Sequence, residues 1–420
     1  MNKIIQVKDI AVLNQDTYKK DEFPAVIQYL DTSSLIKNRV ESYQMLHTDT
    51  DIIPSRAQRK VKQNTILYST VRPNQEHYGI IESIPQNIVV STGFTTLDVI
   101  DDSVNPKYLF YLLAQPHITD YLHTIATNSV SAYPSISPND IGNLKFKVPG
   151  VHDQRKIASV LSALDSKIEL NNRINAEMEA MAKTLYDYWF VQFDYPFDFA
   201  QGKPDKNGKP YKTSGGKMVW NEGLKREIPE GWNPGTLSDI AKITMGQSPP
   251  GESYNEVGDG IVFYQGCTDF GNRFPSIRQY TTAPTRHAKA GDILLSVRAP
   301  VGTLNIAKED CCIGRGLAAL SSKSNCQTYL FEVLRNMRQI FDRRNVDGTT
   351  FGAITKDDLF SLTVAIPSDS ILSKYQELTT PIFERQNIIE WENIKLAELR
   401  DWLLPMLMNG QVKVNEVEHA

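Results

Sequence analysis

Cysteine is scarce in this sequence, and its placement excludes several kinds of site. The 420 residues include four cysteines, Cys267, Cys311, Cys312 and Cys326. None shows C-x-x-C spacing, and no histidine lies close by in a zinc-like arrangement. We therefore expect reduced, partly buried thiols and no metal site.

Long apolar runs are also missing. No stretch approaches the roughly 18 uncharged apolar residues that a membrane-spanning helix needs. Residues 1–9 turn polar again within a few positions, which is not the pattern of a secretory signal. These features predict a cytoplasmic protein without a membrane partner.

An excess of positive charge is missing as well. The net charge is −4, whereas a domain that binds nucleic acid by itself usually carries a basic stripe. Residues 196–227 carry a net charge of +3, while the segments before and after them are negative. Any surface that binds nucleic acid must therefore be local.

Catalytic signatures are absent from the sequence. It contains no Walker A loop, no H-E-x-x-H or G-x-S-x-G motif, and no Asn/Asp-Pro-Pro-aromatic loop of the kind amino-methyltransferases use. Residues 314–319 fit G-x-G-x-x-A, but Arg335 and Arg338 stand where a dinucleotide site needs an acidic residue. A tight turn explains these glycines better, so we predict no catalytic residues.

The same sequence pattern occurs twice along the chain. Residues 135–149 resemble residues 353–367 without a gap, at an offset of 218 that joins Ile136 to Ile354. Other blocks recur in the same order with small shifts, namely residues 7–11 and 237–241, 66–73 and 293–300, 89–94 and 312–317, and 108–110 and 329–331. This order indicates a tandem duplication.

Each half opens with short β-rich segments between Gly, Pro, Asn and Asp clusters, and a helix follows. We therefore expect an α+β fold with two tandem mixed α/β domains, joined by two long antiparallel coiled-coil helices with internal pseudo-two-fold symmetry. The expected bounds are a first domain at 1–150, a first helix at 151–195, a linker at 196–227, a second domain at 228–370 and a second helix at 371–420.

A heptad pattern predicts the two helices. Residues 153–190 contain no glycine or proline, and their apolar positions step by four and then three residues. The second copy is less regular, because Pro381 predicts a kink, and Asn409 with Gly410 predicts the end. The expected seam comprises Ile157, Leu161, Leu164, Ile168, Asn171, Asn175, Met178, Leu185, Trp189, Ile382, Ile389, Asn393, Leu396 and Leu403. Alternatively, each helix packs only on its own domain.

Several segments resemble the specificity subunit of type I restriction–modification systems. EIPEGW at 227–232, MGQSPP at 245–250 and GDILLSVR at 291–298 look like parts of that family's target recognition domain. Residues 154–161 fit Q-x-x-I-x-x-x-L, which resembles the start of the family's spacer helix, and residues 186–193 resemble its end. The first domain lacks the Ile-Pro-x-Gly-Trp segment, and the second helix departs from the Gln-x-x-Ile start.

The resemblance implies a non-catalytic subunit that binds double-stranded DNA. Each domain would read one half of a bipartite, asymmetric target, while the helices set the spacing and dock two methyltransferase subunits, which restriction subunits can join. It implies no cofactor on this chain: S-adenosylmethionine would belong to the methyltransferase partner, and ATP and Mg to the restriction partner.

Arginine and lysine read guanine, glutamine reads adenine, and other cations meet phosphates. On this basis the candidate DNA-binding residues are Arg56, Arg59, Lys60, Lys62, Arg72, Ser131, Tyr133, Gln247, Arg273, Arg298, Arg315, Arg335, Arg338, Arg343, Arg344, Thr349 and Thr350.

Two other functions stay open at the level of the sequence. A two-headed adaptor between proteins would suit the acidic balance, and salt-dependent DNA binding in the presence of the methyltransferase would exclude it. An enzyme with an unfamiliar site would show activity as a purified chain without any partner.

Overall fold

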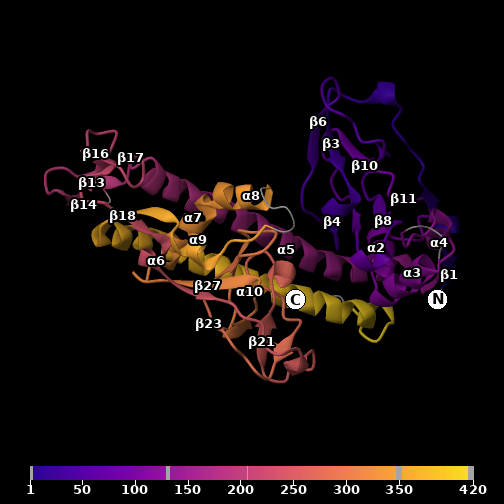
Figure 1. Cartoon of the computed structure of the whole chain (residues 1–420). Helices are drawn as coiled ribbons and strands as arrows, with labels where there is room; N and C mark the ends of the chain where they lie inside the picture. The colour runs from indigo at the N-terminus through magenta and orange to yellow at the C-terminus, as the bar shows by residue number, and fades with distance from the viewer. Residues whose placement is uncertain (1–2, 129–132, 206, 347–351, 415–420) are drawn as a thin grey trace, which may run out of the picture. The chain divides into compact units, whose positions relative to one another are not determined.

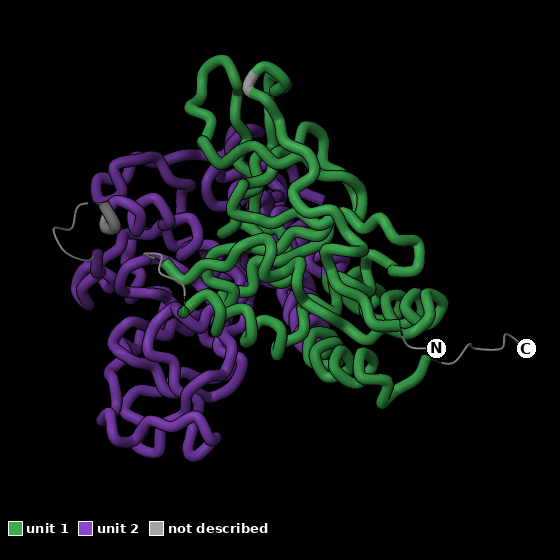
Figure 2. Tube along the Cα trace, turned by 90° about the vertical axis from the view of Figure 1, so that its right-hand side faces the viewer, with its two compact units in different colours: residues 1–168, 395–420 green, residues 169–394 purple. Residues whose placement is uncertain are grey.

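The computed structural model describes residues 3–128, 133–205, 207–346 and 352–414, with the backbone alone for residue 20 and residues 344–346. The chain divides into two compact units, coloured separately in Figure 2. Unit 1 contains residues 1–168 and 395–420, and unit 2 contains residues 169–394. These limits fall inside both long helices, so each helix contributes to both units. The predicted domain bounds, which treat the helices as separate parts, stay a prediction.

Unit 1 begins with a mixed α/β domain (Figure 1). Its strands are β1 (Lys3–Gln6), β2 (Ala11–Leu13), β3 (Val26–Leu30), β4 (Leu35–Ile36), β5 (Arg39–Val40), β6 (Gln44–His47), β7 (Ala57–Arg59), β8 (Ile66–Ser69), β9 (Tyr78–Ile80), β10 (Ile88–Ser91), β11 (Phe94–Val99) and β12 (Lys145–Val148). Its helices before the first long helix are α1 (Val7–Ile10), α2 (Pro106–Leu113), α3 (Pro116–Thr127) and α4 (Pro138–Gly142).

The strands of unit 1 form sheets with the orders β6-β3-β10-β7 and β2-β11-β8-β9, and pairs β1-β12 and β4-β5. Strands β3 and β10 are parallel, and their neighbours run antiparallel to them. Strand β8 is buried along its whole length, as expected of a short continuous apolar run. It joins the cluster that contains Tyr68, Leu97 and Tyr108, which forms the core under α2.

Unit 2 contains the second mixed α/β domain. Its strands are β18 (Asn233–Thr236), β19 (Ala241–Met245), β20 (Tyr254–Asn255), β21 (Ile261–Tyr264), β22 (Tyr280–Thr281), β23 (His287–Ala288), β24 (Ile293–Ser296), β25 (Leu304–Ile306), β26 (Cys311–Ile313), β27 (Leu317–Ser322) and β28 (Thr363–Ile366). Its shorter helices are α6 (Leu237–Ile240), α7 (Gln327–Asn336), α8 (Arg338–Val346) and α9 (Lys356–Phe360). Their sheets have the orders β19-β27-β24-β25 and β20-β22-β21-β26-β23, and β18 pairs with β28.

The two domains share one topology, which confirms the duplication. The order β2-β11-β8-β9 in unit 1 corresponds to β19-β27-β24-β25 in unit 2. The parallel pair β3 and β10 corresponds to β21 and β26. The pair β1 and β12 corresponds to β18 and β28.

Single hydrogen bonds repeat as well. The Ile136 amide donates to the Thr70 carbonyl (2.8 Å), and the Ile354 amide donates to the Val297 carbonyl (3.0 Å). The bridge between Val71 and Ser135 recurs between Arg298 and Ala353. The predicted blocks 66–73 and 293–300 therefore hold equivalent places, each pinned by the repeated block near residue 136 or 354.

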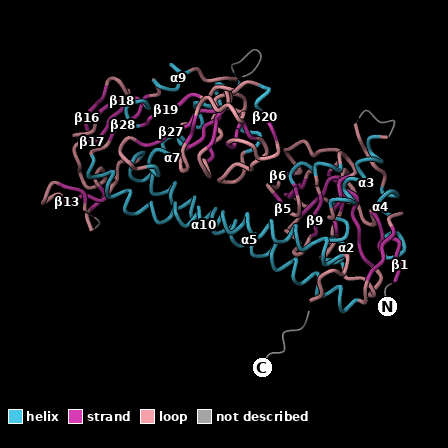
Figure 3. The backbone as a smooth tube through the Cα atoms, turned by 90° about the horizontal axis from the view of Figure 1, so that it is seen from below, coloured by secondary structure: helices cyan, strands magenta, loops and turns pink. Residues whose placement is uncertain are grey.

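The long helices are α5 (Val151–Tyr186), followed by a π-helical turn at Asp187–Val191, and α10 (Asp369–Met408). In each unit their segments lie side by side (Figure 3). In unit 2, Asn171 bonds to Asn393 and Gln386 bonds to the Asn175 carbonyl, so the partner number falls as the residue number rises. The helices are therefore antiparallel, and the alternative of helices packed only on their own domains is wrong.

All members of the predicted seam are buried or half-buried, and Asn171 and Asn393 are hydrogen-bonded between the two helices. Prediction missed part of the second helix, where Tyr375, Thr379 and Gln386 are buried at the same heptad spacing. Helix α10 ends at Met408, as predicted, but it continues without a break through Pro381. Pro381 is exposed, as is Glu377 one turn earlier, so water can satisfy the carbonyl group that loses its amide partner.

The segment predicted as a linker has structure of its own. Within 196–227 lie β13 (Pro196–Asp198), β14 (Lys203–Pro204), β15 (Lys209–Pro210), β16 (Met218–Asn221) and the start of β17 (Arg226–Pro229), which form the sheet β14-β13-β15 and the pair β16-β17. Tyr211 stacks on Tyr195 with ring centroids 4.8 Å apart, and Tyr195 stacks on Trp232 at 5.8 Å. This aromatic stack attaches the segment to the core of unit 2.

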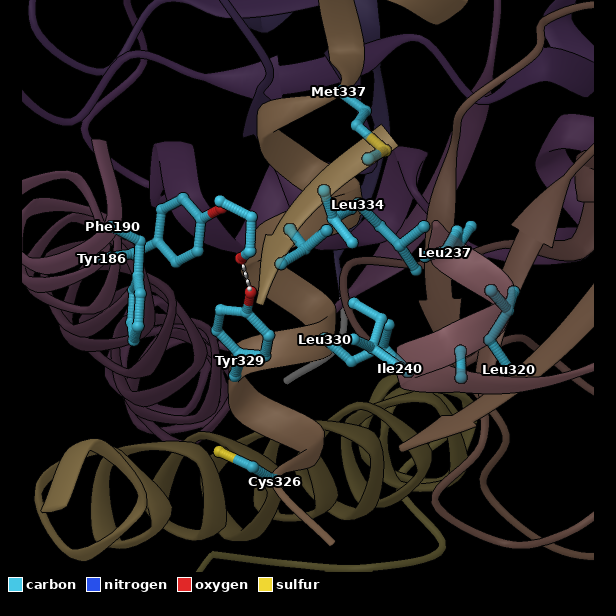
Figure 4. Packing of buried hydrophobic residues seen from close by; sticks show 14 of the residues in the cluster. Tyr186, Phe190, Leu237, Ile240, Leu320, Cys326, Tyr329, Leu330, Leu334 and Met337 are labelled. Atoms are coloured by element: carbon cyan, nitrogen blue, oxygen red, sulfur yellow. Dashed lines mark hydrogen bonds between the residues drawn. The ribbon is translucent and has the colours of Figure 1, made fainter. Parts of the chain in front are cut away.

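The core of unit 2 joins the end of α5 to the second domain (Figure 4). The ring of Tyr329 in α7 lies 4.8 Å from that of Phe190 and 6.2 Å from that of Tyr186. The Tyr329 hydroxyl donates a hydrogen bond to the Ala365 carbonyl (3.1 Å). Burial raises the pKa of Tyr329 well above its usual value, so the hydroxyl stays a donor.

Candidate nucleic-acid interface

An open hollow of about 410 Å³ lies on unit 1 where β8 leads into the loop after it. Its lining brings together Arg56, Arg72 and Tyr133, which the sequence predicted, with Gln75, which it did not. Val71 and Ser135 complete the wall and connect it to the repeated block. The hollow therefore presents two arginines, an amide and an aromatic ring at one place on the surface.

Arg72 is held firmly at the rim of this hollow. Its backbone lies in the left-handed region (φ 47°), and its amide donates to the Pro134 carbonyl (2.9 Å). Its guanidinium carbon lies 5.4 Å from the centre of the Tyr133 ring, within the range of a cation–π contact. Glu76, the nearest acid in the sequence, forms an ion pair with Lys37 (2.8 Å) instead.

The rest of the basic run at 56–62 is less available. Lys60 forms an ion pair with Glu22 (2.7 Å), and Lys62 forms one with Asp16 (3.1 Å). The Arg59 side chain is half-buried, and this burial lowers its pKa. Arg56 is exposed, and no ion pair joins it to a carboxylate within the described ranges. Of the run, Arg56 is thus the cation best placed to meet a ligand.

In unit 2, exposed polar side chains lie around residues 313–316. This loop follows β26 and corresponds to the loop after β10 in unit 1. The backbone amide of Gln247 donates to the Ile313 carbonyl (3.0 Å), and the backbone amide of Ile313 donates to the Arg286 carbonyl (2.9 Å). Arg315 lies inside the loop, and the Val297 amide next to Arg298 donates to the Gly316 carbonyl (2.9 Å). Gln247, Arg286, Arg298 and Arg315 are all exposed.

Sequence reasoning named three of these four residues and missed Arg286. It precedes the two-residue strand β23, and no motif marks it. Only the pairing of β23 with β26 brings it to the loop that holds Arg315. In unit 1, Arg56 has a similar place, because its carbonyl accepts a hydrogen bond from the Thr92 amide (2.8 Å) in the loop after β10.

Two predicted arginines have packing contacts that favour a structural role. Arg335 forms ion pairs with Glu179 of α5 (3.0 Å) and Glu332 (3.2 Å). Arg273 donates to Asn387 of α10, and its guanidinium carbon lies 4.1 Å from the centre of the Phe383 ring. Burial lowers the pKa of Arg273 to about 10, which reflects its removal from water. Both side chains fasten the second domain to the long helices.

The remaining candidates are partly described. Arg338 forms an ion pair with Asp342 (2.9 Å) one turn along α8, and Arg343 is exposed. Arg344 is described by its backbone alone, and Ser131, Thr349 and Thr350 lie outside the described residues.

The four cysteines lie mostly inside the protein. Cys267 is half-buried, the other three are buried, and all four are free thiols. Burial raises the pKa of Cys311 to about 12, so its thiol is unreactive near neutral pH. Within the described ranges, no three His, Cys, Asp or Glu side chains are arranged to hold a metal ion. Nor does the described part of the chain contain a helix long and apolar enough to cross a bilayer.

Comparison with known proteins shows the family to which this chain belongs. A sequence model described as "Type I restriction modification DNA specificity domain" matches residues 2–180 and 229–399. The chain belongs to this family. Each matched range contains one of the duplicated domains and most of the long helix that follows it, so this specificity subunit carries two recognition domains in tandem.

Named relatives span nearly the same length. The HindI specificity subunit of Haemophilus influenzae is 25% identical over 93% of this chain and 95% of its own. A Methanocaldococcus jannaschii protein named as a specificity subunit of type I restriction enzyme MjaX is 30% identical over 83% of this chain and 78% of its own. The solved S subunit from M. genitalium has a TM-score of 0.55 at 15% identity, over 99% of this chain and 97% of its own, and supports the fold alone.

Proposed function

We propose that the two domains of this specificity subunit each read one half of a bipartite, asymmetric DNA target. The observation that carries the proposal is the repeated placement of exposed arginines around the loop after a parallel strand pair, once in each unit. The side chains differ, with Arg56 and Arg72 in unit 1 and Arg286, Arg298 and Arg315 in unit 2. Different readers require different half-sites, which makes the target asymmetric.

The long helices act as the spacer between the half-sites. Helix α5 has 36 residues, which correspond to roughly 54 Å at about 1.5 Å per residue. Half-sites read from the same face of B-DNA lie about one helical turn, or roughly 34–36 Å, apart or a multiple of it. The exposed faces of the two helices dock two methyltransferase subunits, and restriction subunits can join that complex.

Chemistry belongs to these partners in this proposal. The methyltransferase subunits bind S-adenosylmethionine, and the restriction subunits bind ATP and Mg, while this chain supplies recognition without catalysis. The complex works on DNA in the cytoplasm.

Co-expression with the neighbouring methyltransferase, followed by genome-wide mapping of methylated adenines, tests the proposal. We expect a split target with two unlike halves. A continuous or palindromic target would contradict it, and activity of the purified chain alone would point to an enzyme instead.

The spacer role has its own test. Deletion of one heptad from α5 and of the facing heptad from α10 should change the half-site spacing or abolish binding, because the helices set the distance. The bases preferred within each half should stay the same. A changed base preference at unchanged spacing would contradict the spacer role.

A further inference from the structure

Arg72 differs from several lysines of unit 1 in having no acidic partner. Lys3, Lys37, Lys60, Lys62 and Lys107 all form ion pairs with carboxylates at 3.3 Å or less. Such a cation offers little net charge and few free N–H groups to a ligand. Arg72 is exposed, and within the described ranges no carboxylate lies within ion-pair distance of it.

The backbone around Arg72 is fixed before any ligand arrives. The Arg72 amide bonds to the Pro134 carbonyl (2.9 Å), and the Arg72 carbonyl accepts the Gln75 amide (2.9 Å). Pro73 opens the short 3₁₀ turn that follows, and its ring removes one further torsional freedom. The left-handed backbone of Arg72 is unusual for a residue with a side chain, and strain of this kind persists where surrounding contacts enforce it.

The side chain of Arg72 is also restrained. The Tyr133 ring lies beneath the guanidinium at 5.4 Å from its central carbon, and the ring itself is 62% exposed. With the guanidinium over one face of the ring, the N–H groups at its far edge remain available to a ligand. These edge groups form the two-pronged donor that matches the O6 and N7 acceptors of guanine in the major groove.

From these contacts we infer that Arg72, held by Tyr133, reads a guanine in the half-site of the first domain. The inference rests on the proposed function and assigns one base contact within it. Arg56, across the same hollow, has no cation–π contact with any described residue and meets the DNA backbone. Arg72 therefore determines the base preference at one position of the half-site, and Arg56 contributes affinity for DNA of any sequence.

The experiment uses the complex with its methyltransferase and duplexes in which each base pair of the target is changed in turn. Arg72→Ala should lose about 10- to 100-fold of the discrimination at one guanine of one half-site, the range of a single two-pronged contact. Arg72→Lys should retain much of the affinity and lose part of that discrimination, because an ammonium group can reach the guanine acceptors but lacks the planar fork. The other half-site should be read as before.

Variants of the neighbouring residues separate positioning from charge. Tyr133→Phe keeps the ring and should read like the wild type, whereas Tyr133→Ala should lose part of the discrimination at the same guanine. Arg56→Ala should weaken binding to all duplexes alike and lower the slope of log affinity against log salt by about 0.9. Arg39→Ala is the control, because Arg39 is a half-buried arginine of the same unit that forms an ion pair with Glu41 (3.3 Å).

Three results would overturn the inference. These are an unchanged base preference in Arg72→Ala, a uniform loss of affinity like that of Arg56→Ala, or a changed preference at a base pair without guanine. If the wild-type complex has no bipartite target, the proposed function fails first. If the wild-type complex has a bipartite target and Arg72→Ala reads it with the same base preference, this inference fails while the proposed function stands.

Discussion

A buried pair of asparagines holds the two long helices together in unit 2, and its energy can be measured. The Asn171 side-chain amide donates to the Asn393 side-chain carbonyl (2.9 Å) and to Glu392 (2.8 Å). The Asn393 amide in turn donates to Asn172 (2.9 Å). Asn171 is 1% exposed and Asn393 is 7% exposed, so water cannot replace a lost partner.

Asn171→Leu would leave the carbonyl oxygen of Asn393 buried without its donor, which costs about 1–3 kcal/mol. Asn393→Leu removes one of the two acceptors of the Asn171 amide and the donor to Asn172, and it should cost less, about 1 kcal/mol, because the bond from Asn171 to Glu392 remains. In the double variant both polar groups are gone and an apolar seam remains, so that penalty should disappear. The double variant should therefore be more stable than the two single changes predict by about 1–3 kcal/mol.

Hydrogen exchange is the suitable assay, because a chain of two units need not unfold in one step. The free energy of opening is read from amides of residues 169–186 and 386–394 in the wild type, both single variants and the double variant. Asn171→Leu combined with Leu185→Ala is the control, since these positions lie 14 residues apart and should add within about 0.5 kcal/mol. If the free-energy changes of Asn171→Leu and Asn393→Leu also add within about 0.5 kcal/mol, the coupling between the two residues is refuted.

Two further changes test the attachment of each domain to the helices. Asp165→Asn breaks the ion pair with Arg400 (2.8 Å) in unit 1. It should lower the free energy of unfolding by about 2 kcal/mol, less than the roughly 3–5 kcal/mol of a fully buried pair, because both side chains are about one-sixth exposed. An unchanged melting temperature would contradict this. Burial raises the pKa of Glu332 from 4.5 to about 7, so the folded state holds this proton more tightly than the unfolded chain does, and its contribution to stability falls as the pH rises from about 4.5 to about 7. Glu332→Gln cannot ionise and should flatten that decline in melting temperature, whereas an equal decline in the variant would show that other groups cause it.

The duplication and the helical seam were predictable because both are local patterns. The repeated block contains Ser137 and Asp140 in one copy and Thr355 and Asp358 in the other. At the start of a short helix in each copy, the hydroxyl donates a hydrogen bond to the aspartate carboxylate. Capping of this kind depends on residues three apart, which the sequence displays directly. The heptads of α5 are visible for the same reason.

The strands within 196–227 were not predictable from composition. Glycine, proline and lysine dominate the segment and are typical of a flexible linker. The stability of this part comes instead from Phe197 and Tyr211, whose rings meet at 5.0 Å, and from the stack of Tyr211 on Tyr195. A few aromatic side chains that find one another can order a segment whose average composition favours disorder.

The ion pairs of the candidate site were also beyond the sequence. Lys60 and Lys62 belong to the densest basic run of the first domain, yet their partners Glu22 and Asp16 lie about 40 residues earlier. Sheet topology brings them together, since β7 pairs with β10 and the Thr17 backbone bridges to Arg59. A count of charges along the chain cannot distinguish a paired lysine from a free arginine.

This difference explains how a chain of net charge −4 can present a DNA-reading surface. Glu22 and Glu76 form ion pairs with Lys60 and Lys37, whereas the arginines that we propose to contact DNA, such as Arg56 and Arg72, have no such partner among the described residues. Such a surface has enough N–H groups to read bases but too little net charge to attract the phosphate backbone strongly. We therefore expect the isolated chain to bind DNA weakly, with a shallow salt dependence, and both affinity and salt dependence to rise when the methyltransferase subunits join. Equally tight binding by the isolated chain would contradict this division, because the attraction would then have to come from a basic surface of the chain itself.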